Sequence, residues 1–176
     1  MTVEGRTWSN PRTGAWLRYG TEGTDGVLER VMKAHTGMAD AHRHLDYVER
    51  FQVLEGTATV ELEGEKLTVA AGESVEVPRG AAHRNTYNAT DEDLHLLHVA
   101  SPAGAFAEAF VSALGHHMEN DTVDEQGEFS TLQLFVVLRG TRAQSYRAGI
   151  PIPLQKPVIA VGALVGRLRG LKPSYG

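Results

Sequence analysis

The stretch from Gly37 to Gly56, GMADAHRHLDYVERFQVLEG, determines how the rest of the chain is interpreted. It holds two histidines separated by one residue, His42 and His44, and a glutamate, Glu49, on the segment that follows. Side chains alternate between the two faces of a strand, so His42 and His44 point the same way if this segment is extended. Two imidazoles and a carboxylate on the next strand provide three sides of a metal cage. The spacing predicts a metal site and does not name its reaction.

A second stretch, Gly72–Tyr87 (GESVEVPRGAAHRNTY), supplies a candidate fourth ligand. A proline and a glycine end one strand there, and His83 opens the next. If the extended segments 42–44 and 83–87 face each other across a barrel, His83 completes a set of three histidines and one glutamate. By the same alternation of faces, Asn85 and Tyr87 share the face of His83 and are expected to line the same cavity.

Short segments of strand composition surround these two stretches. Thr57–Leu62 alternates with period two, which predicts a strand with one buried and one exposed face. Turn signals separate the segments at intervals of roughly 8–12 residues, and no helical pattern lies between them. We therefore predict an all-β fold, a sandwich or barrel. The expected strands are 15–19, 27–35, 49–54, 57–62, 66–70, 74–77, 83–87 and 93–100.

The pattern changes after residue 100. Ser101 as N-cap and Pro102 as first helical residue predict a helix that ends at Gly115. Residues 116–128 are polar and predict a loop, 129–138 favours a helix, and 151–157 is expected to be extended. A Gly-interrupted apolar helix is expected at 157–168, ending near Arg167 and Arg169 and capping the barrel or a dimer partner. This divides the chain into a β domain with a flanking helix at 1–115 and a helical, basic extension at 116–176.

Charge is distributed unevenly along the 176 residues. All 22 acidic residues lie at or before Glu128, together with 10 basic residues, whereas residues 129–176 hold 7 basic residues and no acid. We expect the basic extension to pack on an acidic body, its own or that of a partner subunit, and we expect a homodimer. Contact with an anionic membrane surface is disfavoured because the basic residues are spaced apart. The net charge of −5 and the lack of a DNA-binding motif argue against a nucleic-acid partner.

Composition sets further bounds. Hydrophobic residues make up 41% and charged residues 22%, as in an ordinary globular protein of about one domain. The chain has no cysteine, which excludes disulfides, thiolate metal ligands and iron–sulfur clusters. The first residues lack the apolar core of a secretory signal, and no apolar run reaches the roughly 20 residues that span a bilayer. We expect a cytoplasmic protein.

The two stretches resemble the two motifs of the cupin superfamily. The first motif corresponds to Gly37, His42, His44, Glu49 and Gly56, with the leading glycine one residue closer than usual. The second corresponds to Gly72, Pro78, Gly80 and His83, and its final asparagine would fall where this chain has Tyr87. The resemblance covers roughly residues 10–100 and is greatest to small bacterial monocupins, one group of which carries a similar helical extension. It implies a jelly-roll β-barrel that holds one divalent metal on His42, His44, Glu49 and His83.

The resemblance leaves the metal and the reaction open. Three nitrogen ligands and one oxygen ligand suit Fe(II), which we favour, and also Zn, Ni, Mn or Cu. One or two open positions would admit a small-molecule substrate or dioxygen. We expect a dioxygenase-like oxidoreductase with substrate chelated to the metal. A non-redox cyclase or isomerase, for example of a polyketide, is the second hypothesis, and a small-ligand-binding protein without turnover is the third.

Further residues are candidates for roles around this site. Glu49 is a candidate general base if it leaves the metal, and Tyr87 and His95 are candidates for moving protons. His95 is preferred over His98 because it shares a face with two apolar residues of its strand. By parity with Glu49, Phe51 and Val53 are expected to form an apolar pocket wall, although core packing explains them equally well. Tyr47 either gates the mouth of the site or sits in a loop.

Overall fold

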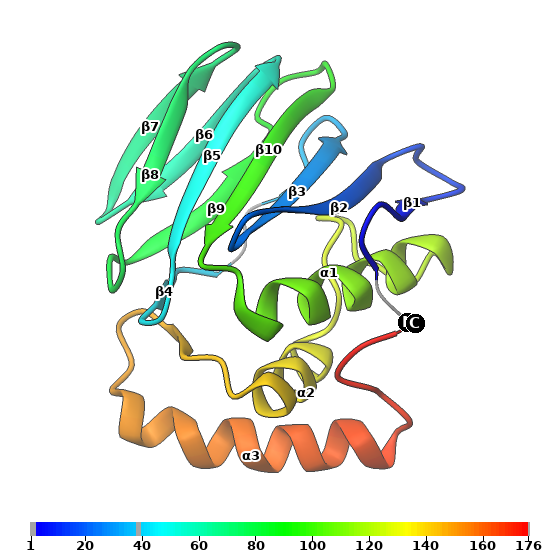
Figure 1. Ribbon diagram of the computed structural model, residues 1–176, viewed down its shortest axis with the longest axis vertical. Helices are drawn as coiled ribbons and strands as arrows, with labels where there is room; N and C mark the ends of the chain where they lie inside the picture. Colours follow the sequence, from blue (N-terminus) through cyan, green and yellow to red (C-terminus); the bar gives the residue numbers. More distant parts are fainter. Residues whose placement is uncertain (1–2, 38–39, 176) are drawn as a thin grey trace.

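The computed structural model describes residues 3–37 and 40–175, which form two antiparallel sheets above three helices (Figure 1). The six-stranded sheet has the order β1-β2-β3-β10-β5-β8. Its strands are β1 (Thr7–Ser9), β2 (Trp16–Glu22), β3 (Asp25–Met32), β5 (Val48–Glu55), β8 (Ser74–Val77) and β10 (Leu94–Ser101). The five-stranded sheet has the order β11-β4-β9-β6-β7. Its strands are β4 (His42–His44), β6 (Thr57–Leu62), β7 (Glu65–Ala70), β9 (His83–Tyr87) and β11 (Ser145–Arg147).

The main core lies between the two sheets. Phe51 and Val53 of β5 pack with Ala58 and Val60 of β6, and all four side chains are 0% exposed. The burial of Ala58 and Val60 confirms the predicted alternation of Thr57–Leu62. Residues that alternate along β strands of two sheets thus interdigitate in one apolar layer. This arrangement confirms the predicted all-β, jelly-roll fold with C-terminal helices.

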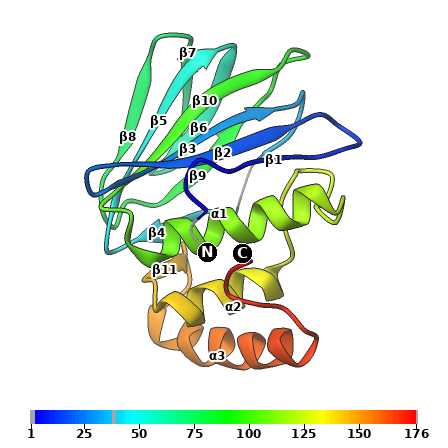
Figure 2. The same ribbon diagram turned by 45° about the vertical axis from the view of Figure 1, so that its right-hand side comes forward.

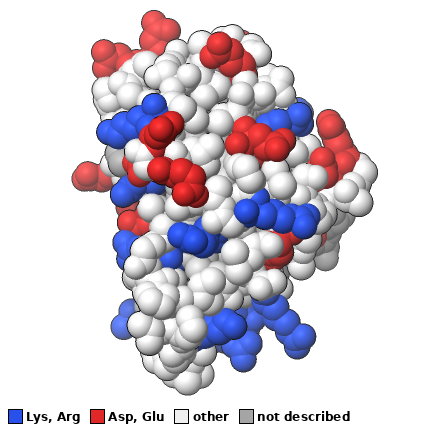
Figure 3. All heavy atoms as spheres, turned by 90° about the vertical axis from the view of Figure 1, so that its left-hand side faces the viewer, with Lys and Arg blue, Asp and Glu red and all other residues white. Residues whose placement is uncertain are grey.

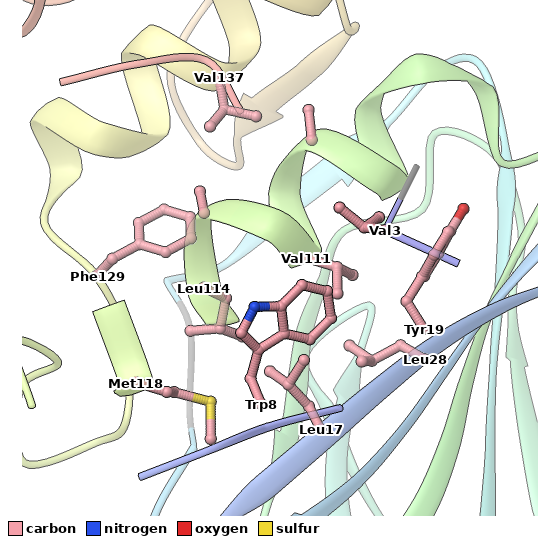
Figure 4. Packing of buried hydrophobic residues seen from close by; sticks show 12 residues of the cluster. Val3, Trp8, Leu17, Tyr19, Leu28, Val111, Leu114, Met118, Phe129 and Val137 are labelled. Carbon is pink, nitrogen blue, oxygen red and sulfur yellow. The ribbon is translucent and has the colours of Figure 1, made fainter. Parts of the chain in front are cut away.

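A second core joins the six-stranded sheet to the first helix, α1 (Gly104–Glu119). Trp8 of β1 and Leu17 of β2 pack there against Leu114 of α1, and all three are nearly fully buried (Figure 4). A Cβ atom at Gly115 would lie 2.4 Å from the indole of Trp8, so only glycine lets the helix approach the sheet this closely. This packing sets the position of α1 under β1–β3.

The helices form successive layers below the sheets. α1 lies against the six-stranded sheet, α2 (Thr131–Thr141) lies beneath it, and α3 (Ile152–Leu168) forms the outermost layer (Figures 1 and 2). The predicted helix at 129–138 is confirmed as α2, whose N-cap Ser130 accepts a hydrogen bond from the backbone N–H of Gln133. Among the described residues, none of the helices has the length and apolar character needed to cross a membrane.

Two predicted limits of α1 are wrong. Ser101 is the last residue of β10, where its hydroxyl donates to Asp25 Oδ1 at 2.7 Å, so it does not cap the helix. Pro102 precedes the helix, which begins at Gly104. Gly115 does not end α1 either, because its role is close packing against Trp8, and the helix continues to Glu119 into the segment predicted as a loop.

The C-terminal predictions need two further corrections. Residues 151–157 are not extended, because α3 begins at Ile152. Pro153 lies in the first turn, where its missing N–H has no helical partner to lose, and Pro157 is accommodated inside the helix. The short strands β1 and β11 lie in segments for which no strand was predicted.

Candidate metal centre

The predicted ligands come together from both sheets. His42 and His44 lie on β4, and His42 stands directly opposite His83 of β9. The expectation that these segments face each other across a barrel is therefore wrong, since β4 and β9 are neighbours in the five-stranded sheet. Glu49 of β5 is contributed by the opposite sheet. The site thus bridges the two layers of the fold.

The four side chains are close enough to share one ion. Their ligand atoms all lie within 4.8 Å of one another. Glu49 Oε2 is 2.7 Å from His83 Nε2, and Glu49 Oε1 is 3.3 Å from His44 Nε2. His44, Glu49 and His83 are buried, with 5%, 3% and 2% of their surface exposed, and His42 is partly buried. This group could hold a metal ion, in agreement with the ligand set that the sequence indicated.

Two of the rings are oriented for metal binding by their backbone contacts. His42 Nδ1 lies 2.7 Å from the carbonyl of Asp40, and His83 Nδ1 lies 3.2 Å from the carbonyl of Ala81. A carbonyl only accepts, so each Nδ1 carries a proton and Nε2 is the ring atom left to face the centre. At His83 this Nε2 lies 2.7 Å from Glu49 Oε2. Either a proton on Nε2 or a cation can lie between these two atoms, and imidazole nitrogens with a carboxylate oxygen are a donor set that fits a divalent metal.

Electrostatics favours the protonation states that metal binding requires. Burial opposes ionisation of Glu49, but the charges of His44 and His98 and hydrogen bonds from His44 and His83 outweigh it and hold the pKa of Glu49 well below its usual value. Burial, together with the neighbouring His44 and His83, lowers the pKa of His42 to about 3. Near neutral pH the site thus contains a carboxylate and a neutral imidazole, both of them competent ligands.

Tyr47 lies beside the centre on the connection between β4 and β5. Its Oη is 3.0 Å from His44 Nε2, and the two rings stack with their centroids 4.2 Å apart. Burial, with the nearby charges of Glu49 and Asp46, raises the pKa of Tyr47. A cavity of about 250 Å³ is lined by Tyr47 and by Phe106 of α1. Tyr47 therefore contacts both the cavity and His44, a candidate metal ligand, and its role as a gate stays a prediction.

His98 is the histidine of β10 that reaches the centre. His98 Nε2 lies 2.9 Å from Glu49 Oε1, whereas His95 Nε2 lies 3.0 Å from Glu29 Oε1 and its ring packs on Trp16. The preference for His95 over His98 as the cavity-facing residue is therefore wrong. Apolar residues occupy both faces of β10, so the alternation of side chains could not show which face is turned toward the centre. That face carries Leu94, Leu96 and His98.

The placement of Asn85 and Tyr87 beside His83 rested on alternation along β9, and that alternation is interrupted. The pairing of β9 with β6 shifts between Thr59 and Glu61, so β9 contains an irregularity that breaks the alternation. Thr86 is buried and contacts Met32, whereas no side-chain hydrogen bond or ring contact links Tyr87 to the centre among the described residues. The roles of Asn85 and Tyr87 in the pocket, and of Tyr87 in catalysis, remain predictions.

Asn88 lies just beyond the end of β9. Asn88, one position beyond the expected site, is 0% exposed. Its Nδ2 donates to the carbonyls of Met32, Lys33 and Glu92, and its Oδ1 accepts from Thr90. Asn88 thus joins the end of β9 to the backbone at the end of β3 and to the turn before β10.

The two glycines that bound the first stretch are required by close backbone approach. Gly37 has φ of 102° and bridges to Tyr87, and a Cβ there would lie 2.3 Å from the carbonyl oxygen of Thr86. Gly56 has φ of 84°, and a Cβ there would lie 2.8 Å from the carbonyl oxygen of Asp93. Both positions combine a left-handed backbone with a lack of space, which only glycine tolerates.

The predicted apolar wall is part of the core between the sheets. The ring of Phe51 lies 4.6 Å from that of His98, so Phe51 contacts a residue that contacts Glu49. Val53 lies two residues further along β5, within the same apolar cluster. Core packing accounts for both residues, and their role in a pocket remains a prediction.

Arg30 and Glu128 form a charged group that sequence reasoning missed. Arg30 pairs across the strands with the buried Leu17 and Leu96, which places it on the inner face of the six-stranded sheet. Burial lowers the pKa of Arg30, and burial raises the pKa of Glu128 despite the opposing charge of Arg30. A charged residue between Leu28 and Met32, both buried, was the available sequence signal.

β11, from the C-terminal extension, holds the edge of β4. Its three residues pair with those of β4, with Ser145 opposite His44 and Arg147 opposite His42. The backbone N–H of Ala148 also donates to the carbonyl of Ala41 at 2.7 Å. Residues from the extension thus fix the strand that carries two candidate ligands.

Comparison with known proteins agrees with this geometry. Residues 28–100 match the family model described as "Cupin domain". No curated protein matches the chain. A protein of unknown function from Streptococcus pyogenes is a similar solved structure, with 18% identity and a TM-score of 0.42, covering 49% of this chain and 72% of that one.

Two other similar structures belong to named proteins. A sugar phosphate isomerase of the cupin superfamily from Silicibacter pomeroyi has 20% identity and a TM-score of 0.44, covering 49% of this chain and 59% of that one. KdgF from Halomonas sp. has 20% identity and a TM-score of 0.46, covering 54% of this chain and 84% of that one. The chain thus spans less than two thirds of the Silicibacter protein.

Proposed function

We propose that this chain, whose residues 28–100 match a cupin domain, is a metal-dependent enzyme that acts on a small organic molecule. The observation that carries the proposal is the convergence of His42, His44, Glu49 and His83 from two sheets, with ligand atoms within 4.8 Å of one another. A purely structural cluster would not need two rings whose Nδ1 atoms are anchored and whose Nε2 atoms face inward.

A divalent ion held by these four side chains would keep positions open for substrate and would supply Lewis acidity or redox capacity. Fe(II) is our preferred metal, with Zn, Ni, Mn and Cu as alternatives, because imidazole and carboxylate ligands accept all of them. The preferred reaction class is a dioxygenase-like oxidation of a substrate that binds the metal through an enolate or phenolate oxygen.

The surrounding residues have definable tasks in this proposal. His98 holds Glu49 Oε1 at 2.9 Å and thereby fixes the orientation of the carboxylate. Phe51 and Phe106 place apolar surface against His98 and His44, which keeps water away from the centre. The cavity beside Tyr47 is the proposed substrate pocket, and movement of Tyr47 would connect it to His44.

A non-redox isomerase or cyclase is the second candidate, and a specific observation favours it. Tyr47 Oη and His98 Nε2 lie next to His44 and Glu49, so two groups able to hold protons flank the proposed ligands. Such groups can remove a proton from one substrate atom and deliver it to another while the metal polarises a carbonyl. Binding of a small ligand without turnover is the third candidate.

The test combines metal analysis with turnover. The protein is stripped of metal, loaded separately with Fe(II) or Zn(II), and assayed for oxygen uptake with catechols, flavonols and β-diketones. The dioxygenase proposal predicts uptake with the Fe(II) form alone and its loss in His44→Ala. His95→Ala is the matched control, since His95 contacts Glu29 rather than the centre.

Other outcomes distinguish the candidates. Activity of the Zn(II) form equal to that of the Fe(II) form, without oxygen uptake, would favour the isomerase or cyclase. Ligand binding by the metal-loaded protein with no product in either form would favour a binding protein. Failure to bind any divalent metal would refute the enzyme proposal in all its forms.

A further inference from the structure

Helix α3 turns its small residues inward and its large apolar residues outward. Ala163 and Gly166 are buried against α2. A Cβ at Gly162 would lie 2.2 Å from the ring of Phe135, and one at Gly166 would lie 2.6 Å from Val136. Larger residues do not fit on this side, so the orientation of α3 is set by its glycines.

The opposite side of α3, called here the α3 face, is apolar and exposed. Its residues are Leu154 (63% exposed), Val158 (57%), Val161 (63%), Leu164 (59%), Val165 (36%) and Leu168 (80%). α3 is the outermost layer of the molecule (Figures 1 and 2), and these residues are spread from its first turn to its last. Scattered exposed apolar residues are normal, but six on one continuous helix face indicate a surface that contacts something else.

The segment that carries the α3 face has only positive charges. Residues 129–176 contain 7 basic residues and no acid. Lys156, Arg167, Arg169 and Lys172 are exposed, and within the described part of the chain none of them forms an ion pair. In Figure 3 the lower end of the molecule, where α3 lies, carries blue and white atoms, and the acidic side chains lie above it. The face therefore combines exposed apolar side chains with uncompensated positive charge.

Exposed apolar side chains next to positive charge could contact either a second copy of this chain or an anionic lipid surface, and the charge favours the second. Apolar residues at 154, 158, 161, 165 and 168 have the spacing of a helix-pairing seam. A symmetric antiparallel pair of α3 helices would, however, place side by side two copies of a segment that has seven basic residues and no acid, so nothing in the segment would offset the positive charge. An anionic lipid surface complements both features, because apolar side chains enter the acyl boundary while arginine and lysine reach the headgroups.

We propose that α3 binds flat on the surface of an anionic lipid bilayer through the α3 face, with Lys156, Arg167 and Arg169 in the headgroup layer. The helix lies at the periphery of the fold, so binding in this manner needs no rearrangement of the sheets. The fold presents a rigid helix rather than one that must form on binding, which lowers the entropic cost of attachment. The spacing of the basic residues, which argued against a membrane at the level of sequence, is that of residues flanking an apolar helix face.

The experiment is co-sedimentation of the full chain with vesicles of phosphatidylcholine alone or of phosphatidylcholine and phosphatidylglycerol at 3:1. We expect at least tenfold stronger binding to the anionic vesicles and loss of that preference in high salt. Leu164→Glu/Leu168→Glu should weaken binding at least tenfold, and Arg167→Gln/Arg169→Gln should weaken it several-fold. Lys66→Gln/Arg79→Gln, which removes two exposed basic residues far from α3, is the matched control and should bind like the unaltered protein.

Thermal unfolding and metal content of each variant establish that the fold is intact. Equal binding to neutral and anionic vesicles would overturn the role of the basic residues. Absence of binding to either vesicle would overturn the proposal outright. If, in addition, light scattering showed a dimer that Leu164→Glu/Leu168→Glu converts to monomer, the α3 face would be an interface between two copies of this chain.

Discussion

The candidate metal centre and the α3 face are opposite exceptions to the usual distribution of residues. The first buries polar side chains, and the second exposes apolar ones. At the centre, three histidines and a glutamate lie together in or next to the interior, with Glu49 and His83 almost fully buried. On α3, six large apolar side chains are exposed while small ones are buried. Buried polar groups and exposed apolar patches are the two informative exceptions to burial rules, and this chain has one of each.

The two regions differ in where their unusual side chains find partners. Each polar atom of Glu49 finds an imidazole nitrogen within the chain, so the buried carboxylate is satisfied by the histidines around it. The apolar side chains of the α3 face have no partner among the described residues, so their complement must come from outside. The first exception therefore points to chemistry inside the molecule and the second to attachment.

The largest effect is expected from breaking the centre. His44→Ala removes a ligand and leaves the Glu49 carboxylate without one of its partners. Metal affinity should fall by more than about 100-fold, since loss of groups that only support metal ligands already costs 10–100-fold. Metal analysis after dialysis measures this, with His95→Ala as the control that keeps one ion per chain. Full metal content in His44→Ala would show that the ion binds elsewhere.

The pH dependence of the metal-free protein tests the burial of the centre. The pKa of His42 is about 3 in the folded chain, whereas an unfolded histidine takes up its proton near 6.5. Between these values the unfolded chain binds more protons, so the stability that neutral His42 contributes is complete above about pH 6.5 and is lost as the pH falls.

Between pH 7 and pH 5 the free energy of unfolding should fall by about 2 kcal/mol more in the unaltered protein than in His42→Gln. The difference arises because the unfolded chain takes up nearly one proton at His42 over this range and the folded chain does not. Urea unfolding at both pH values measures the difference. His35→Gln is the control, since His35 is exposed and lies beside Asp91. Equal pH dependence in the unaltered protein and in His42→Gln would mean that His42 is solvated.

The sequence predicted the candidate ligands partly from local geometry and partly from the resemblance of its two stretches to the cupin motifs, since His83 lies on a strand distant in sequence. Alternation on a strand places His42 and His44 on one side, and turn glycines at positions 37 and 56 bound the segment that carries Glu49. The strand segments and the helix α2 followed from the same short-range patterns. These features depend on neighbours within a few residues, which a sequence displays directly.

The features that were missed depend on which elements meet in space. β10 has apolar residues on both faces, so the choice between His95 and His98 required knowing which face meets the other sheet. Gly115 looks like a helix terminator until Trp8 is found against it. The spacing of α3 shows an apolar helix, but only its packing on α2 shows that the glycine side is inward and the leucine side is free.

β11 links the two regions, and a smaller effect is expected from disturbing it. Ala148→Pro removes the N–H that donates to the carbonyl of Ala41, just before the strand of His42 and His44. We expect metal affinity to fall about tenfold, because one net hydrogen bond is worth about 1 kcal/mol and the proline ring adds strain. Ala148→Ser keeps the N–H and serves as the control in a metal-competition titration. Unchanged affinity in Ala148→Pro would show that β4 is held in place without β11.

The smallest effect is expected where α3 joins β11. Gln155 is buried, its Oε1 accepts from the N–H of Arg147 at 2.8 Å, and its Nε2 donates to the carbonyls of Arg147 and Ile150. Gln155→Ala should lower the free energy of unfolding by about 1–2 kcal/mol, because these backbone groups lose their partner. Gln144→Ala, at an exposed position, is the control in urea unfolding. Metal affinity should not change in Gln155→Ala, since the pairing of β11 with β4 does not involve the glutamine side chain. A parallel loss of metal affinity would mean that α3 itself orders the ligands, and the two regions would then act as one unit.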